Sequence, residues 1–176
     1  MSPCFRIGDV KPEIVVLGSC PGRLEKLDGT PFAGQAGSNL SNLLTELTRE
    51  NLIGVNDAIY DRYDVTLLNA HCTALWKSEH GRTEPYVREI KVPANLERLR
   101  RRLEEVKCRR LVCVGKKAKR AFELVLKEGP IESIETAHLV GHPSQQHLNS
   151  HYRHFRPELR LAKMVKNTLR VLPLGK

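Results

Sequence analysis

The sequence predicts an α/β fold: a three-layer α/β/α sandwich around a central, mostly parallel four-stranded sheet. Four short apolar runs, at residues 14–17, 65–68, 111–114 and 137–140, are separated by segments with helical periodicity. Near-continuous apolar runs of this length are typical of strands that are buried on both faces. Because strands and helices alternate, right-handed crossovers are expected to place helices on both faces of the sheet.

The helices are predicted from apolar positions that recur every three to four residues. Leucines at 40, 43, 44 and 47 predict the first helix, with Ser38 as its N-cap. Similar stripes predict helices at 96–106, at 118–125 and at 161–169. The polar segment 77–92 contains a glycine and a proline and is predicted to be a surface loop.

Length and composition limit the class of protein. With 176 residues, the chain is predicted to form a single domain over residues 1–176. Hydrophobic residues make up 40% and charged residues 28%, which excludes a disordered chain. No apolar run approaches the ~18–20 residues of a membrane span, so no membrane partner is expected. The opening residues, MSPCFR, lack the apolar segment of a secretory signal, and no signal peptide is expected either.

The charge of the chain indicates its partner. There are 29 Lys and Arg against 20 Asp and Glu, a formal net charge of +9, and such an excess favours nucleic acid. We expect phosphate contacts where basic residues and histidines concentrate, at 98–102, 109–110, 116–120 and 138–156. Five scattered cysteines predict reduced thiols and a cytoplasmic (nucleoid-associated) or nuclear location. Nothing in the sequence indicates an obligate protein partner.

Polar and glycine-rich segments follow the predicted strands. The first strand leads into GSCPG at 18–22, the second into NAHC at 69–72, and the last into HPS at 142–144. Ligands of parallel α/β sheets bind beyond the carboxyl ends of the strands. We therefore expect these three segments to form one site.

These segments, together with GTPFAGQAG at 29–37, resemble the uracil-DNA glycosylase superfamily. The resemblance is closest to the family-four-like branch and covers residues 17–148, most of the chain. It implies one uracil-DNA-glycosylase-like domain that binds DNA. The implied activity is that of a monofunctional DNA N-glycosylase without lyase activity. Such an enzyme hydrolyses the N-glycosidic bond of a flipped-out uracil or other damaged or modified base and leaves an abasic site.

The resemblance assigns roles to residues of the implied base pocket. Phe32 would stack on the flipped base, and Asn69 would read the base edge with its amide; Gly18 and Pro21 belong to the same substrate-binding turn. His142, as a neutral imidazole, would stabilise the departing base. The structural alternatives are a core phenylalanine, a strand-terminating asparagine and a surface histidine.

The segment after His142 corresponds to the part of the family that inserts into the DNA minor groove. Leu148 would fill the gap left by the flipped nucleotide, or else would be a loop leucine that covers the core. Phosphate contacts are expected from the crowded histidines and from Arg153. The predicted DNA-binding residues are Ser144, Gln145, Gln146, His147, Leu148 and Arg153.

The first turn departs from the family pattern. The family-four branch has a glutamate at the position of Ser19, and other branches have an aspartate or asparagine at that of Cys20. These two residues therefore occupy catalytic positions, but neither is a carboxylate that could activate water. Three explanations stay open. Ser19 orients the water; Glu25 or Asp28 supplies a carboxylate, although solvated loop charges are the more frequent case; or the base leaves more readily than uracil.

The cysteines also depart from the pattern. The family-four branch holds an iron–sulfur cluster with four cysteines, two of them in a C-x-x-C pair. Cys4 is not part of a C-x-x-C pair, because residue 7 is an isoleucine. Cys72 falls near the position of the third cluster ligand, and residues 92–94, where the fourth ligand is expected, contain no cysteine. We predict no metal and no cofactor. A packed turn explains His71 beside Cys72 better than a nucleophile does.

Two further functions compete with an active uracil glycosylase. Excision of a hypermodified base, such as a phage-type cytosine, would use the same fold. A catalytically idle DNA-binding module would explain the missing carboxylate. A phosphate-binding nucleotide enzyme is disfavoured, because no Lys-Ser or Lys-Thr pair follows the glycines at 18–22.

Overall fold

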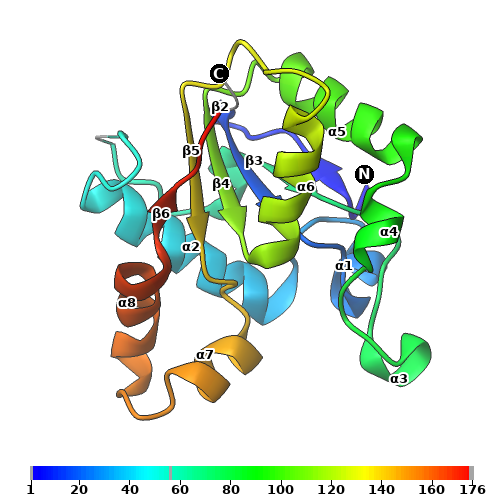
Figure 1. The fold of residues 1–176 in the computed structure, drawn as a ribbon. Coiled ribbons are helices and arrows are strands. Elements are labelled where there is room, and N and C mark those ends of the chain that lie inside the picture. The colour runs from blue at the N-terminus through cyan, green and yellow to red at the C-terminus, as the bar shows by residue number, and fades with distance from the viewer. Residues whose placement is uncertain (1, 56, 175–176) are drawn as a thin grey trace.

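The middle layer of the protein is a mostly parallel sheet (Figure 1). Over residues 2–55 and 57–174, which the computed structural model describes, the sheet has six strands in the order β1-β3-β2-β4-β5-β6. The four central strands are parallel, namely β2 (Lys11–Gly18), β3 (Val65–Asn69), β4 (Arg110–Val114) and β5 (Thr136–Val140). Each contains one of the predicted apolar runs. The predicted α/β fold is thus confirmed.

The two outer strands were not predicted, and the expected count of four strands is wrong. β1 (Phe5–Arg6) pairs antiparallel with β3, and β6 (Arg170–Val171) pairs antiparallel with β5. Each has two residues, which is too short for a periodic pattern to show in the sequence.

The longer helices match the four predicted stripes. They are α2 (Gly34–Arg49), α5 (Pro93–Glu105), α6 (Lys116–Leu126) and α8 (Pro157–Thr168). The predicted cap of α2 is wrong, because Ala33 is the N-cap and Ser38 lies inside the helix. Within the helix, Gly37 packs onto the preceding loop, where a Cβ would lie 1.7 Å from the Phe32 carbonyl oxygen. Among the described residues, no helix combines the length and apolarity needed to cross a bilayer.

The short helices lie in the loops around the sheet. They are α1 (Arg23–Asp28), α3 (Lys77–His80), α4 (Val87–Ile90) and α7 (Gln145–His151), with a 3-10 turn η1 (Arg62–Asp64). The predicted loop at 77–92 therefore contains two single-turn helices. Helices this short depend on tertiary contacts, so the sequence carries little local signal for them.

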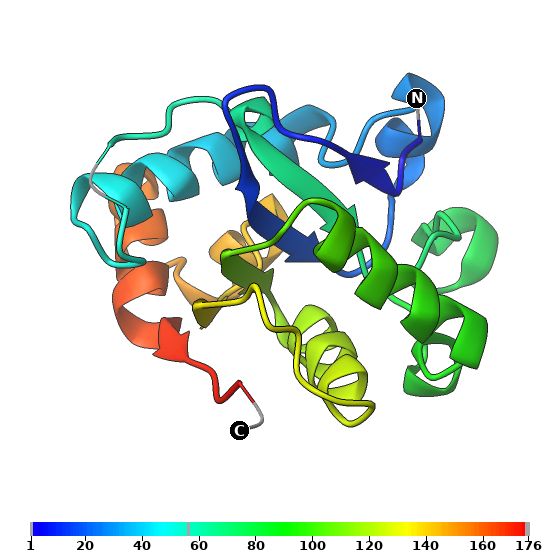
Figure 2. The same cartoon turned by 90° about the horizontal axis from the view of Figure 1, so that it is seen from above.

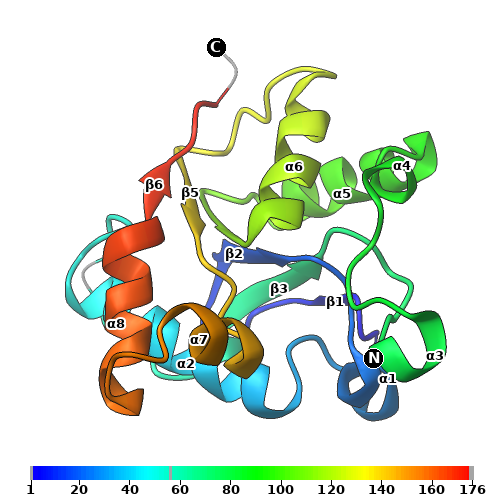
Figure 3. The same cartoon turned by 60° about the horizontal axis from the view of Figure 1, so that its bottom comes forward.

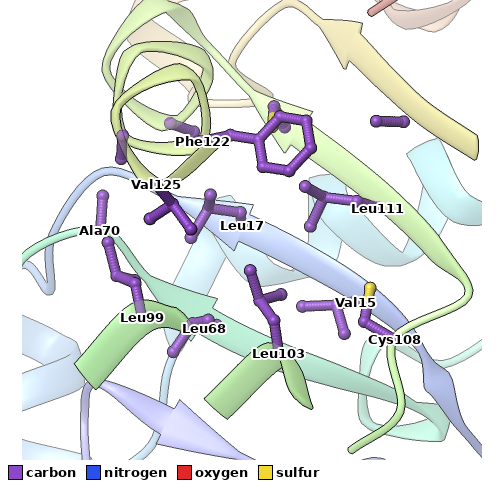
Figure 4. Packing of buried hydrophobic residues seen from close by; sticks show 14 of the residues in the cluster. Val15, Leu17, Leu68, Ala70, Leu99, Leu103, Cys108, Leu111, Phe122 and Val125 are labelled. Carbon is purple, nitrogen blue, oxygen red and sulfur yellow. The ribbon is translucent and has the colours of Figure 1, made fainter. Parts of the chain in front are cut away.

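Helices cover both faces of the sheet, as Figure 2 shows from above, and alternate strand residues pack against opposite helical layers. Val15 and Leu17 of β2 pack with α5 and α6, whereas Ile14 and Val16 pack with α2, α7 and α8. Figure 4 shows Phe122 and Val125 of α6 in the first of these layers. Because both faces of the sheet are covered, the loops at the strand ends are where functional side chains can be reached from solvent.

Candidate active site

A cavity of about 480 Å³ opens where the parallel strands end. Figure 3 brings this edge forward, with α1, α3 and α7 arranged around it. The lining includes the residues that follow three strands and the start of α2, among them Ser19, Cys20, Phe32, Asn69 and His142. The structure thus brings together the three strand-end segments that the sequence singled out.

Gly18 lies beneath the two side chains that the resemblance assigns to base binding. A Cβ on Gly18 would lie 2.6 Å from Phe32 Cζ and 2.6 Å from Asn69 Oδ1, so only glycine allows both to reach this point. Phe32 is 3% exposed and adopts a φ of 54°, a left-handed conformation that is rare outside glycine. Pro21 supports the wall of the cavity, because its carbonyl accepts the Leu75 N–H at 2.9 Å.

The carboxylate of Glu25 fixes the turn that carries Phe32. One oxygen accepts the Phe32 N–H at 2.7 Å, and the other accepts the N–H of Gly22. Burial raises the pKa of Glu25, and these two hydrogen bonds counteract the rise. The expectation of a solvated loop charge is therefore wrong for Glu25, which lines the cavity, whereas Asp28 is exposed at the end of α1.

Asn69, the last residue of β3, is 1% exposed. Its Nδ2 donates to the Pro3 carbonyl at 3.2 Å, and its backbone N–H donates to the Cys4 carbonyl at 2.9 Å. Its Oδ1 faces the point above Gly18. An amide held in this way leaves one N–H and the oxygen for a ligand in the cavity.

His142 presents a neutral imidazole to the cavity. Its Nδ1 accepts the Ser144 N–H at 3.2 Å, so the ring proton of the neutral form lies on Nε2. Burial, followed by the nearby His147, lowers the pKa of His142 to about 4. At neutral pH the ring is therefore an uncharged hydrogen-bond donor.

This low pKa predicts how stability depends on pH. The pKa of His142 in the folded protein, about 4, lies below its value near 6.5 in the unfolded chain. The unfolded chain therefore takes up a proton on His142 at a higher pH than the folded protein does. As a result, the contribution of neutral His142 to the free energy of unfolding is complete above about pH 6.5 and is lost as the pH falls towards 4. Denaturant unfolding between pH 7 and pH 4 should show wild type losing more stability than His142→Gln. Parallel curves for the two proteins would contradict the assignment.

Ser19 and Cys20 line the cavity without a charge. Ser19 is 5% exposed, and its Oγ has no hydrogen-bond partner within the described part of the chain. Burial and the charge of Glu25 raise the pKa of Cys20 to about 12, and its thiol lies 3.5 Å from the Thr83 carbonyl oxygen. Cys20 is thus protonated at neutral pH, which gives no support to a role as base or nucleophile. Ser19 retains an unused hydroxyl.

The predicted DNA-binding segment forms α7, and its residues point in different directions. Ser144 is the N-cap of α7 and lines the cavity, as do Gln146 and His147. Gln145 instead lines a separate groove with residues of α2 and α8. Leu148 is 5% exposed and packs in the core against α2 and α8, so its prediction as a wedge is wrong in this structure. Arg153 is exposed just beyond the helix.

Hydrogen bonds of Asn39 join α7 and the His142 loop to the first half of the chain: one runs to Pro143 and a longer one, of 3.4 Å, runs to Gln145 Oε1. Asn39 of α2 is 8% exposed and donates from Nδ2 to the Pro143 carbonyl at 2.8 Å. The two residues are 104 positions apart. The loop that carries His142 is thereby anchored to the helix that follows Phe32.

Trp76 is a cavity residue that the sequence did not indicate. It is half-buried between β3 and α3, with Lys26 Nζ 5.1 Å from its ring centroid and the His80 ring 4.7 Å away at its edge. Thr83 and Glu84 also line the cavity from this segment. The available signal was the single tryptophan of the chain, which directly precedes the predicted loop at 77–92.

Several basic residues have structural partners rather than a free face for phosphate. Arg98 donates to the Asn69 and Ala70 carbonyls, and Arg100 donates to the Val125 and Gly129 carbonyls. Arg109 and Arg110 approach Glu135 at the amino end of β4, the edge opposite the cavity. Arg98 and Arg100 are therefore engaged inside the protein and not free for the phosphate contacts expected at 98–102, whereas contacts at 109–110 would lie on the edge away from the cavity. His138, 5% exposed in β5, is likewise unavailable.

The cysteines correct a second expectation. Cys4 and Cys72 form a disulfide across 68 residues, whereas Cys20, Cys108 and Cys113 are free. The prediction that all thiols are reduced is wrong, because β1 brings Cys4 to the end of β3. The cysteines do not fit the iron–sulfur cluster that the resemblance implies. A cluster requires four thiolates, Cys108 and Cys113 are buried in the core, and no metal-binding group of three or more candidate side chains occurs within residues 2–55 and 57–174.

Comparison with known proteins agrees with this geometry. The family model of the uracil DNA glycosylase superfamily matches residues 5–167, most of the chain. A search of curated proteins finds no match. The matched region contains the cavity residues described above, from Ser19 to His151. The chain belongs to the uracil DNA glycosylase superfamily.

Proposed function

We propose that this protein is a monofunctional DNA N-glycosylase that removes a flipped-out uracil or another damaged or modified base and leaves an abasic site. Superfamily membership supports a glycosylase-type hydrolase that acts on DNA in base excision. The observation that carries the finer proposal is the convergence of Phe32, Asn69 and His142 on one cavity. A stacking ring, a fixed amide and a neutral donor are the groups that excision of a base requires.

Binding comes first in the proposed mechanism. The flipped base stacks on Phe32, a contact worth about 1–3 kcal/mol. The free N–H and the oxygen of Asn69 pair with the base edge and set the preference among bases. Gly18 leaves the room for both contacts, because it contributes no side chain.

Bond cleavage follows. The bond between the base nitrogen and the sugar C1′ breaks, and its electron pair stays on the base. Negative charge spreads to a base carbonyl, where Nε2–H of His142 stabilises it. A neutral donor fits this step because the low pKa of His142 keeps its proton placement fixed at neutral pH. Water then adds to C1′ and releases a proton, which neutralises the base.

Ser19 is the proposed positioning group for the water, since its buried Oγ has no other partner among the described residues. Ser19→Ala should lower kcat about tenfold, as expected for one lost hydrogen bond, with little change in KM. Steady-state excision assays measure both, and single-turnover assays isolate the chemical step. Full activity in Ser19→Ala would redirect the role to Glu25, and Glu25→Gln would then be the variant that loses activity.

The proposal of hydrolysis without strand cleavage rests on the composition of the cavity. In the described part of the chain no lysine lines it, so no amine is placed for a Schiff base. Trapping with borohydride on a cleavable oligonucleotide should give no covalent protein–DNA product. A trapped adduct would show lyase chemistry.

The test of the proposed function is a panel of oligonucleotides, each with one uracil, hypoxanthine, xanthine or modified cytosine, treated with protein and then with alkali. Cleavage at one base identifies the substrate. DNA binding without cleavage of any member would favour the idle DNA-binding module that the absent motif carboxylate suggests. We propose a cytoplasmic or nuclear location, where DNA is available.

Trp76 should contribute to binding of the strand beside the flipped base. Trp76→Leu is expected to weaken binding of a single-stranded oligonucleotide about tenfold, because one base–aromatic contact is worth about 1–3 kcal/mol. Fluorescence anisotropy measures the affinity. Tyr60→Leu is the matched control: Tyr60 is 73% exposed and lies before η1, at the amino edge of the sheet. An equal effect of both variants would exclude a specific role.

A further inference from the structure

The segment that contains Cys4 lies along the end of β3, beside the proposed base-reading amide. Phe5 pairs with Leu68 and Arg6 with Leu67, which gives only a two-residue ladder. Pro3 and Cys4 continue past this ladder and supply both acceptors of Asn69: the Cys4 carbonyl for its backbone N–H and the Pro3 carbonyl for its Nδ2. The orientation of the Asn69 side chain thus depends on the backbone of Pro3 and Cys4, which lies beyond this ladder.

The other end of the disulfide is firmly held. Cys72 lies in the loop after β3, where the His71 N–H donates to the Ser19 carbonyl at 2.9 Å and the Leu75 N–H donates to the Pro21 carbonyl at 2.9 Å. The Cys4–Cys72 bond therefore ties the Pro3–Cys4 segment to the loop that borders the cavity. Cys72 is exposed, whereas Cys4 is 3% exposed, so a reductant can reach the bond from the side of Cys72.

The Pro3 carbonyl decides which way the Asn69 amide faces. A carbonyl accepts only from the NH2 side of the amide, so this contact fixes Nδ2 towards Pro3 and Oδ1 towards the cavity. Without it, the terminal torsion of an asparagine is soft and nearly two-fold, and the amide can turn over. A turned amide presents its N–H where the oxygen was and its oxygen where the N–H was. The preferred base is then held less well in the position in which it reacts, and the preference among bases changes.

We propose that Cys4 and Cys72 are positioning residues: their disulfide holds the Pro3–Cys4 backbone against Asn69 and thereby sets the amide that reads the base. This inference rests on the proposed function. It makes base excision sensitive to redox state. A dithiol reductant transfers two electrons and two protons, the S–S bond breaks to two thiols, and the reductant becomes a disulfide. Reduction frees the segment and lowers excision, and reoxidation by a small disulfide restores it.

The experiment compares excision by the full chain before and after treatment with dithiothreitol, well below the unfolding temperature. Reduction should lower kcat about tenfold or more with little change in KM for DNA, because a misplaced reacting group costs rate more than binding. Cys72→Ser should have the low kcat of the reduced protein, and dithiothreitol should not change it. Cys108→Ala is the matched control and should keep the full redox response, since Cys108 is free and buried away from the cavity. Unchanged kcat on reduction would overturn the proposal.

A second measurement does not depend on activity. Thiol titration of the unreduced, denatured protein should find three free thiols, those of Cys20, Cys108 and Cys113. The side-chain amide resonances of Asn69, assigned through Asn69→Asp, should move on reduction of wild type and stay fixed in Cys72→Ser. Five free thiols, or immobile resonances, would overturn the proposal. If the protein removes no base in either state but these resonances move, the proposed function fails while the positioning role stands.

Discussion

His142→Ala is expected to reduce the rate of base excision by about 10²–10³-fold, the usual effect of removing one donor from developing negative charge. The reason is the placement of its proton. With Nδ1 engaged by the Ser144 N–H, the neutral ring has its donor on Nε2, and the lowered pKa keeps it in that form at neutral pH. Alanine leaves the departing base without this partner.

Single-turnover assays on the substrate found by the base panel measure this loss. DNA affinity, read by anisotropy across salt concentrations, should stay nearly constant, because phosphate contacts supply most of it. His154→Ala is the matched control: His154 is exposed beyond α7 and does not line the cavity. Full activity of His142→Ala would remove the proposed electrostatic role.

Asn69→Ala is expected to lower excision about 10²-fold and to narrow the difference in rate between the preferred base and its competitors. A bidentate amide contact is worth about 1–3 kcal/mol of discrimination, and alanine removes both of its hydrogen bonds. The variant also leaves the Pro3 carbonyl without its partner. Measurement of kcat/KM for two bases separates lost recognition from a general loss of rate.

Asn149→Ala serves as the control for this variant. Asn149 is exposed on α7, and its amide oxygen accepts hydrogen bonds from Gln145 and Arg160 outside the cavity. It should retain both the rate and the selectivity of wild type. If Asn69→Ala kept the selectivity of wild type while losing rate, Asn69 would act in positioning the sugar rather than in reading the base.

The strand-end rule is the reason that much of the candidate site could be predicted. Apolar runs buried on both faces located the strands, and parallel strands bring their carboxyl ends to one edge. Ser19, Asn69 and His142, which are far apart in the sequence, were expected to meet for that reason, and they line one cavity. The prediction needed no knowledge of side-chain packing.

Other parts depended on tertiary contacts that leave no local pattern. Leu148 faces the core because α7, a helix of only seven residues, docks that side against α2 and α8, and so short a helix has no periodic signal in the sequence. Glu25 became a cavity residue through hydrogen bonds to Gly22 and Phe32, which only the folded turn brings near. Trp76 directly precedes the predicted loop at 77–92, and no strand or helix pattern in the sequence covers it.

The disulfide shows the same limit over a longer distance. Cys4 and Cys72 meet because a two-residue strand pairs with β3, and neither the strand nor the pairing has a sequence signature. Scattered cysteines without framework spacing favoured reduced thiols. The arrangement of the sheet edge overrode that expectation.

The Asn39–Pro143 hydrogen bond has a consequence for the order in which activity arises during folding. Phe32 and Asn69 belong to the first 70 residues, whereas the loop with His142 is anchored to α2 only across 104 positions. Loop closure over such a distance is slow compared with local pairing. Excision should therefore return in a refolding chain only when the loop with His142 has docked on α2, although Phe32 and Asn69 lie within the first 70 residues.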